Sequence, residues 1–350
     1  MKSPGYWSLV PGPRSAGQQS AHRSALGSGR AAPRTVAGGF IVTSARWHFL
    51  LEEGEPPCYV FPLCPSERVP TPLLYESHCH TPLCKHATGQ PADYAAVAAQ
   101  RGLKGIIVTC HAPLPDGLGL DHRMAPEEFD AYVNLVARAR AEFADRVDVR
   151  LGLESDYFPG VEAWTERLHA RVPLHHVLGS VHMQVPHYKS RYYNGDDFAY
   201  QQTYFTHLAA SAETGLFDTL AHPDLVKNEA PHAWSFPRIQ PHIERALDRI
   251  AATGVALELN TSGLQKALPE MNPGPRMLAL VRERGIPVVL GSDAHRPSRV
   301  AADFGPALRL LADLGFTHVS YFLERRRHNL PVAEALASLR EPGNPTPARP

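Results

Sequence analysis

The sequence lacks the features of membrane-spanning proteins, of nucleic-acid-binding proteins and of proteins that bind an acidic membrane surface. Its 350 residues contain no run of about 18 or more apolar residues, so no segment is long enough for a transmembrane helix. Lys plus Arg and Asp plus Glu both number 35, and this balance gives no general attraction to nucleic acid or to an acidic membrane. We therefore expect neither a membrane nor a nucleic acid as a partner, and the oligomeric state stays open.

Cysteine is scarce and irregularly spaced. An odd number of cysteines without any Cys-x-x-Cys pair indicates neither a disulfide framework nor a structural zinc knuckle. We interpret all five as small apolar residues and expect a reducing compartment, the cytoplasm. The five are Cys58, Cys64, Cys79, Cys84 and Cys110.

The beginning of the chain lacks acidic residues. No Asp or Glu precedes Glu52, and residues 1–72 are rich in Gly, Pro, Ser, Ala and Arg, a composition typical of an unfolded segment. We interpret 1–72 as a disordered leader or as an overextended start, with translation then beginning near Val69. A transit peptide has a similar composition, but no clear amphipathic helix is present. We expect one domain at 73–338 and a frayed, Pro-rich tail at 339–350.

Short apolar runs alternate with longer amphipathic segments from Leu73 onward. This order predicts an α/β fold with parallel strands, and the hydrophobic fraction of 43% is enough for a sizeable core. The expected strands are 73–78, 105–111, 147–154, 176–182, 217–222, 255–260 and 287–293, with a candidate edge strand at 317–322. The expected helices are 92–101, 126–143, 161–171, 196–214, 238–253, 276–284 and 301–314.

Histidine is abundant, with 19 residues, and two of them follow the first strand closely. His78 and His80 are two positions apart, so on extended chain their side chains share a face. Neutral imidazole is the commonest ligand for zinc and similar ions, and His86 follows in a loop that would bring it back. This segment therefore indicates a metal site.

The ends of the other strands carry further ligand types. Six of the seven expected strands end in one, and the carboxyl ends of strands in a barrel of alternating strands and helices form its catalytic face. We therefore expect these distant side chains to converge. After His78 and His80 they are His111, Glu154, His182, His222, Asp293 and, beyond the last strand, His295.

These segments resemble the successive motifs of the polymerase-and-histidinol-phosphatase (PHP) superfamily. Within it, the chain is most similar to the histidinol-phosphate phosphatases, over about residues 73–325. The segments are Ser77-His78-Cys79-His80-Thr81-Pro82-Leu83-Cys84-Lys85-His86, Thr109-Cys110-His111, Gly152-Leu153-Glu154, Gly179-Ser180-Val181-His182, Ala221-His222-Pro223-Asp224 and Gly291-Ser292-Asp293-Ala294-His295.

The resemblance implies a fold, a cofactor and an activity. The fold is a distorted TIM-like (β/α)7 barrel, the cofactor is up to three divalent ions of zinc, iron or manganese, and the activity is hydrolysis of L-histidinol phosphate to L-histidinol and phosphate in histidine biosynthesis. One ion would take His78, His80 and Asp293, and Glu154 would bridge to a second ion on His182 and His222. The third ion would take His86, His111 and His295.

Two positions depart from the pattern of the family. Glu76 stands where an Asp usually precedes Ser-His, a change beside the ligands that we expect to be tolerated. Cys110 stands in place of the Asp of Thr-Asp-His. The loss of that carboxylate would alter how His111 is oriented or how a proton moves, or the thiol would itself become a ligand.

The expected reaction is attack on phosphorus by a hydroxide that bridges two ions, which lower the pKa of water and neutralise the phosphoryl oxygens. Glu154 is the expected bridge, and Asp293 and His295 are candidates for stabilising the leaving hydroxyl. Cations on loops above the site are candidates for binding the small-molecule phosphate ester. They are Arg123, Lys189, Arg191, Lys227 and Arg296.

Three alternatives keep parts of this interpretation. The first is a PHP phosphoesterase acting on nucleotides or oligonucleotide ends. The second is a metal-binding module without turnover, which retention of every ligand type disfavours. The third is an amidohydrolase, which also begins with His-x-His but commonly ends its fourth strand in a carbamylated Lys, where this chain has His182.

Overall fold

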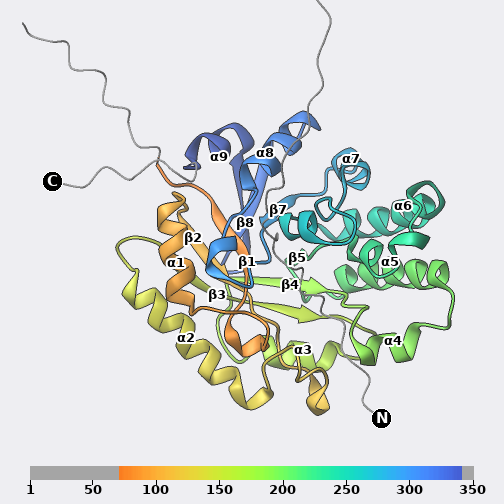
Figure 1. Ribbon diagram of the computed structural model, residues 1–350, viewed down its shortest axis with the longest axis horizontal. Helices are drawn as coiled ribbons and strands as arrows, with labels where there is room; N and C mark the ends of the chain where they lie inside the picture. The colour runs from red at the N-terminus through yellow and green to blue at the C-terminus, as the bar shows by residue number, and fades with distance from the viewer. Residues whose placement is uncertain (1–70, 341–350) are drawn as a thin grey trace, which may run out of the picture. The chain divides into compact units, whose positions relative to one another are not determined.

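The computed structural model describes residues 71–340, and the expected leader and most of the expected tail lie outside this range. Its centre is a sheet of nine strands that neighbour one another in chain order (Figure 1). The pairs from β1 to β8 are all parallel, and β8 and β9 form an antiparallel hairpin. The strands are β1 (Tyr75–Cys79), β2 (Gly105–Val108), β3 (Asp148–Asp156), β4 (His176–Ser180), β5 (Thr219–Leu220), β6 (Ala256–Asn260), β7 (Val288–Gly291), β8 (His318–Leu323) and β9 (Arg326–Pro331).

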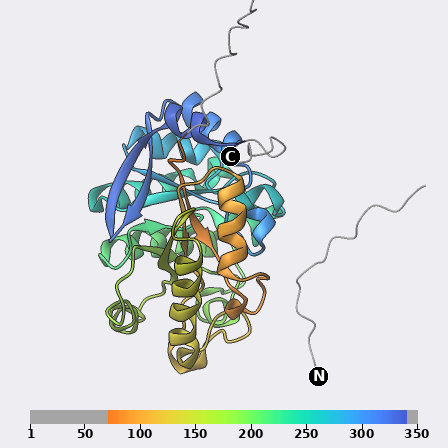
Figure 2. The ribbon, with the colours of Figure 1, turned by 90° about the vertical axis from the view of Figure 1, so that its left-hand side faces the viewer.

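Helices connect the parallel strands, as the alternating pattern predicts. The seven expected helices are all present, whereas α4, β9 and α9 were not expected. Figure 2 shows α1 and α2 next to each other on one side of the sheet, and these two helices contact each other. The helices are α1 (Pro91–Gln100), α2 (Phe129–Glu142), α3 (Glu162–His169), α4 (Pro186–Tyr192), α5 (Asp197–Glu213), α6 (Phe236–Thr253), α7 (Pro275–Glu283), α8 (Phe304–Asp313) and α9 (Val332–Ser338).

Helix α6 illustrates how local sequence produces these elements. Its buried side chains include Ile239, Ile243 and Leu247, which recur every four residues and so form one apolar stripe towards the sheet. Gly254 ends the helix with φ of 76°, a left-handed conformation that glycine adopts without the steric cost of a side chain. The next residues return to the sheet as β6, whose five residues are all buried.

The sheet curves until its first strand meets the segment that follows β7. Cys79 and Ala294 form a single parallel bridge, in which the Ala294 N–H donates to the His78 carbonyl and the His80 N–H donates to the Ala294 carbonyl, both at 3.0 Å. No continuous ladder joins β1 to β7 among the described residues. The α/β fold is confirmed, but the barrel is not closed, because one isolated bridge rather than a strand pair joins β1 to the segment after β7.

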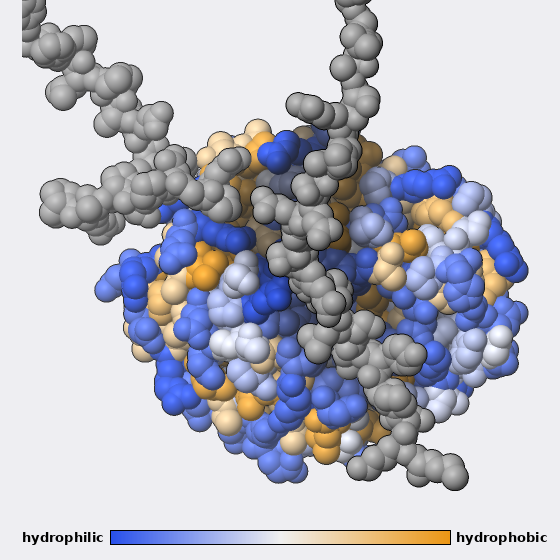
Figure 3. Space-filling model, in the orientation of Figure 1, coloured by the Kyte–Doolittle hydropathy of each residue, from blue (hydrophilic) through white to orange (hydrophobic). Residues whose placement is uncertain are grey.

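The outer surface is that of a globular α/β domain. Hydrophilic side chains dominate the visible face in Figure 3, with apolar residues scattered among them. Within residues 71–340, Leu120 is the one large apolar side chain that is exposed. No helix in that range combines the length and the apolarity needed to cross a bilayer.

Candidate metal centre

Glu154, on β3, lies at the centre of a buried cluster of imidazoles. Its carboxylate is 2.8 Å from His111 Nδ1 and 3.0 Å from His222 Nε2. These side chains come from the ends of different strands, so the convergence expected from the strand ends is observed. The remaining separations from the Glu154 carboxylate are 3.3 Å to His78 Nε2, 3.3 Å to His182 Nε2 and 3.7 Å to His80 Nε2.

Asp293 brings a second carboxylate to the same cluster. Its Oδ1 lies 3.0 Å from His80 Nε2, 3.6 Å from His78 Nε2 and 3.4 Å from His295 Nδ1. Asp293 has φ of 50° and His222 has φ of 30°, which are uncommon conformations for residues other than glycine. Backbone strain of this kind concentrates at functional sites, where the surrounding fold must hold it.

His86 and His295 form the outer side of the cluster. Their rings stack with centroids 4.5 Å apart, and His295 also stacks on His80 at 3.9 Å. The Nδ1 of His86 is 2.7 Å from the Cys84 carbonyl, and the Nδ1 of His295 is 3.0 Å from the Asp293 carbonyl. Each backbone carbonyl accepts a hydrogen bond from the Nδ1–H group, so Nε2 is the nitrogen that would bind an ion in these two histidines.

Two further carboxylates lie behind the imidazoles and were missed from the sequence. Glu258, on β6, is 2.7 Å from His78 Nδ1, and Asp156, at the end of β3, is 2.8 Å from His182 Nδ1. A carboxylate at the second nitrogen fixes the tautomer of a histidine ligand and its orientation. Asp156 was detectable, because it lies two positions after Glu154 and so shares its face of the strand.

The carboxylates make the inner part of the cluster favourable for positive charge. Burial alone would lower the pKa of His78, but Glu258, Glu154 and Asp293 outweigh it and raise that pKa well above its usual value. Burial alone would raise the pKa of Glu154, but the positive charge of the neighbouring imidazoles that stay protonated, His78 and His182, holds it well below its usual range. Glu154 is therefore ionised, and the cluster is built to hold cations.

The two sides of the cluster differ in protonation. Burial opposes protonation of His182, yet Asp156 and Glu154 raise its pKa to about 10. On the other side, burial lowers the pKa of His111 to about 3, against the effect of Glu154. Burial likewise holds the pKa of His295 well below its usual value. His111 and His295 are thus neutral imidazoles, which is the form that binds a metal.

The donor atoms of the cluster are arranged better for binding metal ions than for forming hydrogen bonds with one another. Several buried atoms have no hydrogen-bond partner among the described residues, although an unpaired buried polar atom is costly. Sets of three donors also lie within 4.8 Å of one another, including His78, His80 and Asp293, and His80, His111 and His295. The atoms without a hydrogen bond of good geometry are His78 Nε2, His80 Nδ1, His111 Nδ1, His222 Nδ1, His295 Nε2 and Glu154 Oε2, although His111 Nδ1 and Glu154 Oε2 lie 2.8 Å apart.

Glu76 connects the two strand tips that form the join. Its buried carboxylate accepts the backbone N–H groups of His78 at 3.0 Å, Ser292 at 2.9 Å and Ala301 at 2.6 Å, and also the Ser292 hydroxyl. Within residues 71–340 it makes no hydrogen bond or ion pair with an imidazole. The change from Asp therefore affects how β1 is tied to the segment after β7, consistent with its expected place beside the ligands.

Of the five predicted phosphate-binding cations, Lys227 has to be withdrawn. Its ammonium group is fully buried and bonds to Asp224 at 2.9 Å, the Met271 carbonyl at 2.9 Å and Glu270 at 3.0 Å. All three N–H donors of a lysine are engaged by these contacts. Lys227 therefore holds the loop after β5 to the loop after β6, and that requirement for buried pairing was not visible in the sequence.

The other four cations differ in position. Arg123 is buried, and its guanidinium donates to Asp156 at 2.7 Å, so it supports the carboxylate behind His182. Lys189 and Arg191 lie on α4, where Lys189 pairs with Glu229 at 2.5 Å and Arg191 lies over the Tyr192 ring. Arg296 is exposed directly after His295. Lys189, Arg191 and Arg296 reach solvent, and their role in substrate binding stays a prediction.

The comparison with protein families decides where this site belongs. A family model described as the PHP domain matches residues 76–262, more than half of the chain. The chain belongs to the PHP family. The matched range begins at Glu76, on β1, and ends just after β6, so it includes all but Asp293 and His295 of the nine predicted ligands.

Relatives and solved structures agree with this PHP assignment. A Deinococcus radiodurans protein named "Probable histidinol-phosphatase" is 37% identical over 257 residues, covering 71% of this chain and 96% of that protein. A Bacillus subtilis "Histidinol-phosphatase" is 28% identical and covers 64% of this chain and 94% of that protein. The structure of a Lactococcus lactis histidinol phosphate phosphatase, complexed with zinc, L-histidinol and phosphate, is similar with a TM-score of 0.61 at 20% identity, covering 73% and 98% of the two chains.

Proposed function

We propose that this PHP protein is a metal-dependent histidinol-phosphatase, which hydrolyses L-histidinol phosphate to L-histidinol and phosphate. The observation that carries the proposal is the convergence of imidazoles from several strand ends on the Glu154 carboxylate. The names of the Deinococcus radiodurans and Bacillus subtilis relatives support this substrate.

The cofactor in this proposal is up to three ions of zinc, iron or manganese. Bound ions would supply a water of lowered pKa and positive charge against the phosphoryl oxygens. The residues that would hold them are His78, His80, His86, His111, Glu154, His182, His222, Asp293 and His295. The buried Nε2 atoms of His78 and His295, which lack a hydrogen bond of good geometry, and the strongly depressed pKa of the Glu154 carboxyl support this assignment.

Glu154 is the residue that would connect two ion positions. Its Oε1 accepts the Ser180 hydroxyl at 2.5 Å and faces His182 and His222, whereas its Oε2 faces His78 and His111. A carboxylate offers two oxygens to different neighbours, so this side chain serves both sides of the cluster at once. Substitution by an amide removes the charge while it preserves the volume.

Asp293 and His295 are the proposed groups nearest the leaving hydroxyl. The His295 side chain is 28% exposed, so its edge reaches the opening of the cluster while Asp293 lies deeper, at 10% exposure. Because His295 is neutral with its proton on Nδ1, its Nε2 would hold an ion whose positive charge stabilises the departing alkoxide, and Asp293 would keep the ring oriented. Arg296, Lys189 and Arg191 are the proposed contacts to substrate, with Arg123 acting through Asp156.

The test is phosphate release by purified protein loaded separately with zinc, iron or manganese. Histidinol phosphate, nucleoside monophosphates and a short single-stranded oligonucleotide are compared side by side. We expect histidinol phosphate to be preferred, and Glu154→Gln to lose more than the ~100-fold that is typical when only a group behind a ligand is removed. Glu142→Gln, an exposed carboxylate at the end of α2, is the matched control. Equal activity of Glu154→Gln and Glu142→Gln would refute the proposal. A preference for the oligonucleotide would mean that histidinol phosphate is not the substrate.

We further propose that 73–338 is the catalytic domain and that the protein works in the cytoplasm. The mass of the protein isolated from its native cells decides whether 1–72 is a leader or an overextended start. A mass that corresponds to a chain starting near Val69 supports the interpretation of 1–72 as an overextended start.

A further inference from the structure

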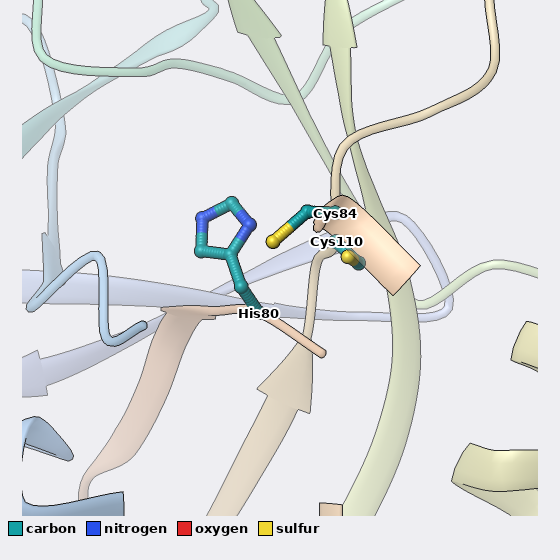
Figure 4. A group of neighbouring side chains, drawn as sticks. All are labelled: His80, Cys84 and Cys110. Atoms are coloured by element: carbon teal, nitrogen blue, oxygen red, sulfur yellow. The ribbon is translucent and has the colours of Figure 1, made fainter. Parts of the chain in front are cut away.

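Two cysteines lie against one of the proposed ligands, on the side that faces away from Glu154. Cys84 ends the short 3-10 helix η1 (Pro82–Cys84) and Cys110 follows β2, and both are completely buried, as is His80. Figure 4 shows the two sulfur atoms next to the imidazole of His80, with one ring nitrogen directed towards them. One donor atom from each of the three residues lies within 4.8 Å of the other two.

The imidazole of His80 has a different neighbour at each nitrogen. Its Nε2 is 3.0 Å from Asp293 Oδ1, within the cluster already described. Its Nδ1 is buried, makes no hydrogen bond of good geometry, and lies against the Cys110 thiol, which also interacts with the Cys84 thiol. One imidazole nitrogen and two sulfur atoms thus face the same buried space, which is a donor set that an ion can occupy in place of these weak contacts.

The surroundings of Cys110 favour sulfur as an acceptor. The Thr81 N–H and the Thr81 hydroxyl both donate to Cys110 Sγ, at 3.4 and 3.2 Å, while the thiol itself donates to the Thr81 carbonyl at 3.7 Å, a contact that is lost when the thiol ionises. Two donors aimed at one sulfur stabilise negative charge there, as they would in a thiolate bound to a cation. Thiolate and imidazole donors together select soft or borderline ions rather than Mg²⁺ or Ca²⁺.

We propose that His80, Cys84 and Cys110 form a separate metal site for a thiophilic d¹⁰ ion of the zinc and cadmium type. The ion takes Sγ of both cysteines and Nδ1 of His80, while His80 Nε2 stays directed to the catalytic cluster. Binding releases the two thiol protons and, when both nitrogens of His80 are ligated, the ring proton as well. The site shares one imidazole with the catalytic cluster but does not depend on the proposed phosphatase activity.

The experiment uses cadmium, whose bonds to thiolate absorb in the ultraviolet whereas its bonds to imidazole and carboxylate do not. Cys58 and Cys64 are replaced by Ser in the full-length chain, because they would bind cadmium on their own. The reduced protein is then titrated with Cd²⁺ under a phosphine reductant. We expect a thiolate-to-cadmium band that loses at least half of its intensity in both Cys84→Ser and Cys110→Ser.

Cys79→Ser is the matched control. Cys79 is equally buried, but its thiol donates to the Ile107 carbonyl at 3.7 Å, a contact that a hydroxyl can replace. We expect the band of this variant to be unchanged. Far-ultraviolet circular dichroism checks the fold of every variant, and Cys84→Ala and Cys110→Ala replace any serine variant that fails to fold.

Two results would overturn the proposal. One is the absence of a thiolate band in the reduced protein. The other is a band that disappears in Cys84→Ser but persists in Cys110→Ser, because Cys84 also lies within 4.8 Å of donors from His86 and His295 and would then bind there alone. Phosphate release is measured on the same samples. If the protein with wild-type Cys84 and Cys110 shows the thiolate band but releases no phosphate, the phosphatase proposal is rejected. If it releases phosphate but shows no thiolate band, the thiolate site is rejected.

Discussion

Glu258 provides the sharpest test of how the cluster is held, because it contacts two of the proposed ligands, His78 and His222, without being a proposed ligand itself. Its Oε1 lies 2.7 Å from His78 Nδ1, and its Oε2 accepts the His222 N–H at 2.8 Å and the Asn260 amide at 3.0 Å. Both oxygens are therefore acceptors. A glutamine offers only one acceptor, so Glu258→Gln has no orientation that satisfies all three contacts.

Each orientation of the new amide has a definite cost. With its oxygen towards His222 and Asn260, the amide nitrogen faces His78 Nδ1, and the ring must move its proton to Nε2, the nitrogen that faces Glu154. With the opposite orientation, three donors face one another, namely the new glutamine amide, the His222 backbone N–H and the Asn260 amide. Loss of a carboxylate behind a histidine ligand typically lowers metal affinity 10–100-fold, which is about 1.4–2.7 kcal/mol.

The assay is competition for zinc against a chromophoric chelator, followed by phosphate release as a function of zinc concentration. We expect Glu258→Gln to need 10–100-fold more zinc for half-maximal activity, as the ~1.4–2.7 kcal/mol predicts. Glu142→Gln, on the surface, should match the wild type. Zinc affinity of Glu258→Gln within about twofold of the wild type, in a protein of unchanged circular dichroism, would refute the idea that Glu258 fixes His78.

Three further predictions concern stability and the corrected role of Lys227. Removal of ions with a chelator should lower the free energy of unfolding by about 2.7 kcal/mol relative to protein kept at an ion concentration 100 times Kd, and urea curves that coincide would count against a resident metal. Lys227→Met should destabilise the protein by about 3–5 kcal/mol, because the Asp224 carboxylate is left buried without its charged partner. The KM for histidinol phosphate should stay constant. A tenfold rise in KM would restore Lys227 as a substrate contact. Burial lowers the pKa of His169 to about 4, so the unfolded chain binds more protons between pH 6.5 and 4, and stability is lost as the pH falls through that window by at most about 1.4 kcal/mol per unit. His169→Gln, whose amide reaches the position of Nε2 and can keep the hydrogen bond to Ser155, should flatten that slope in urea titrations at several pH values. An unchanged slope would exclude this histidine as its source.

The sequence predicts the strand ends well because parallel strands place their last residues at one edge regardless of sequence distance. His111 lies just after β2 and Glu154 lies near the end of β3, the next strand along the chain. A single bridge between the two residues puts both side chains in the cluster. The same rule does not say which residue stands behind a ligand. Glu258 is 180 positions from His78 and lies on the one expected strand without a ligand at its end, so only the curvature of the sheet brings the two together.

Other differences have local causes. The short helix α4 carries Tyr188, Tyr192 and a proline at its start, and seven residues leave too little periodicity for a helix to be predicted. The strand β9 is mostly exposed and rich in Arg, Asn and His, so its pairing with β8 rests on backbone hydrogen bonds rather than on an apolar pattern.

The position of Glu76 has a consequence for the order of events in folding and loading. His78 and His80 flank Cys79 on one side of the bridge between β1 and the segment after β7, and Asp293 and His295 flank Ala294 on the other side. Glu76 holds the two sides together through the backbone N–H groups of Ser292 and Ala301. If this bridge opened, the proposed ligands of one ion would be separated into two pairs. Formation of the bridge and binding of the ion are therefore linked, and amide hydrogens along the bridge should exchange with solvent faster in metal-free enzyme than in loaded enzyme.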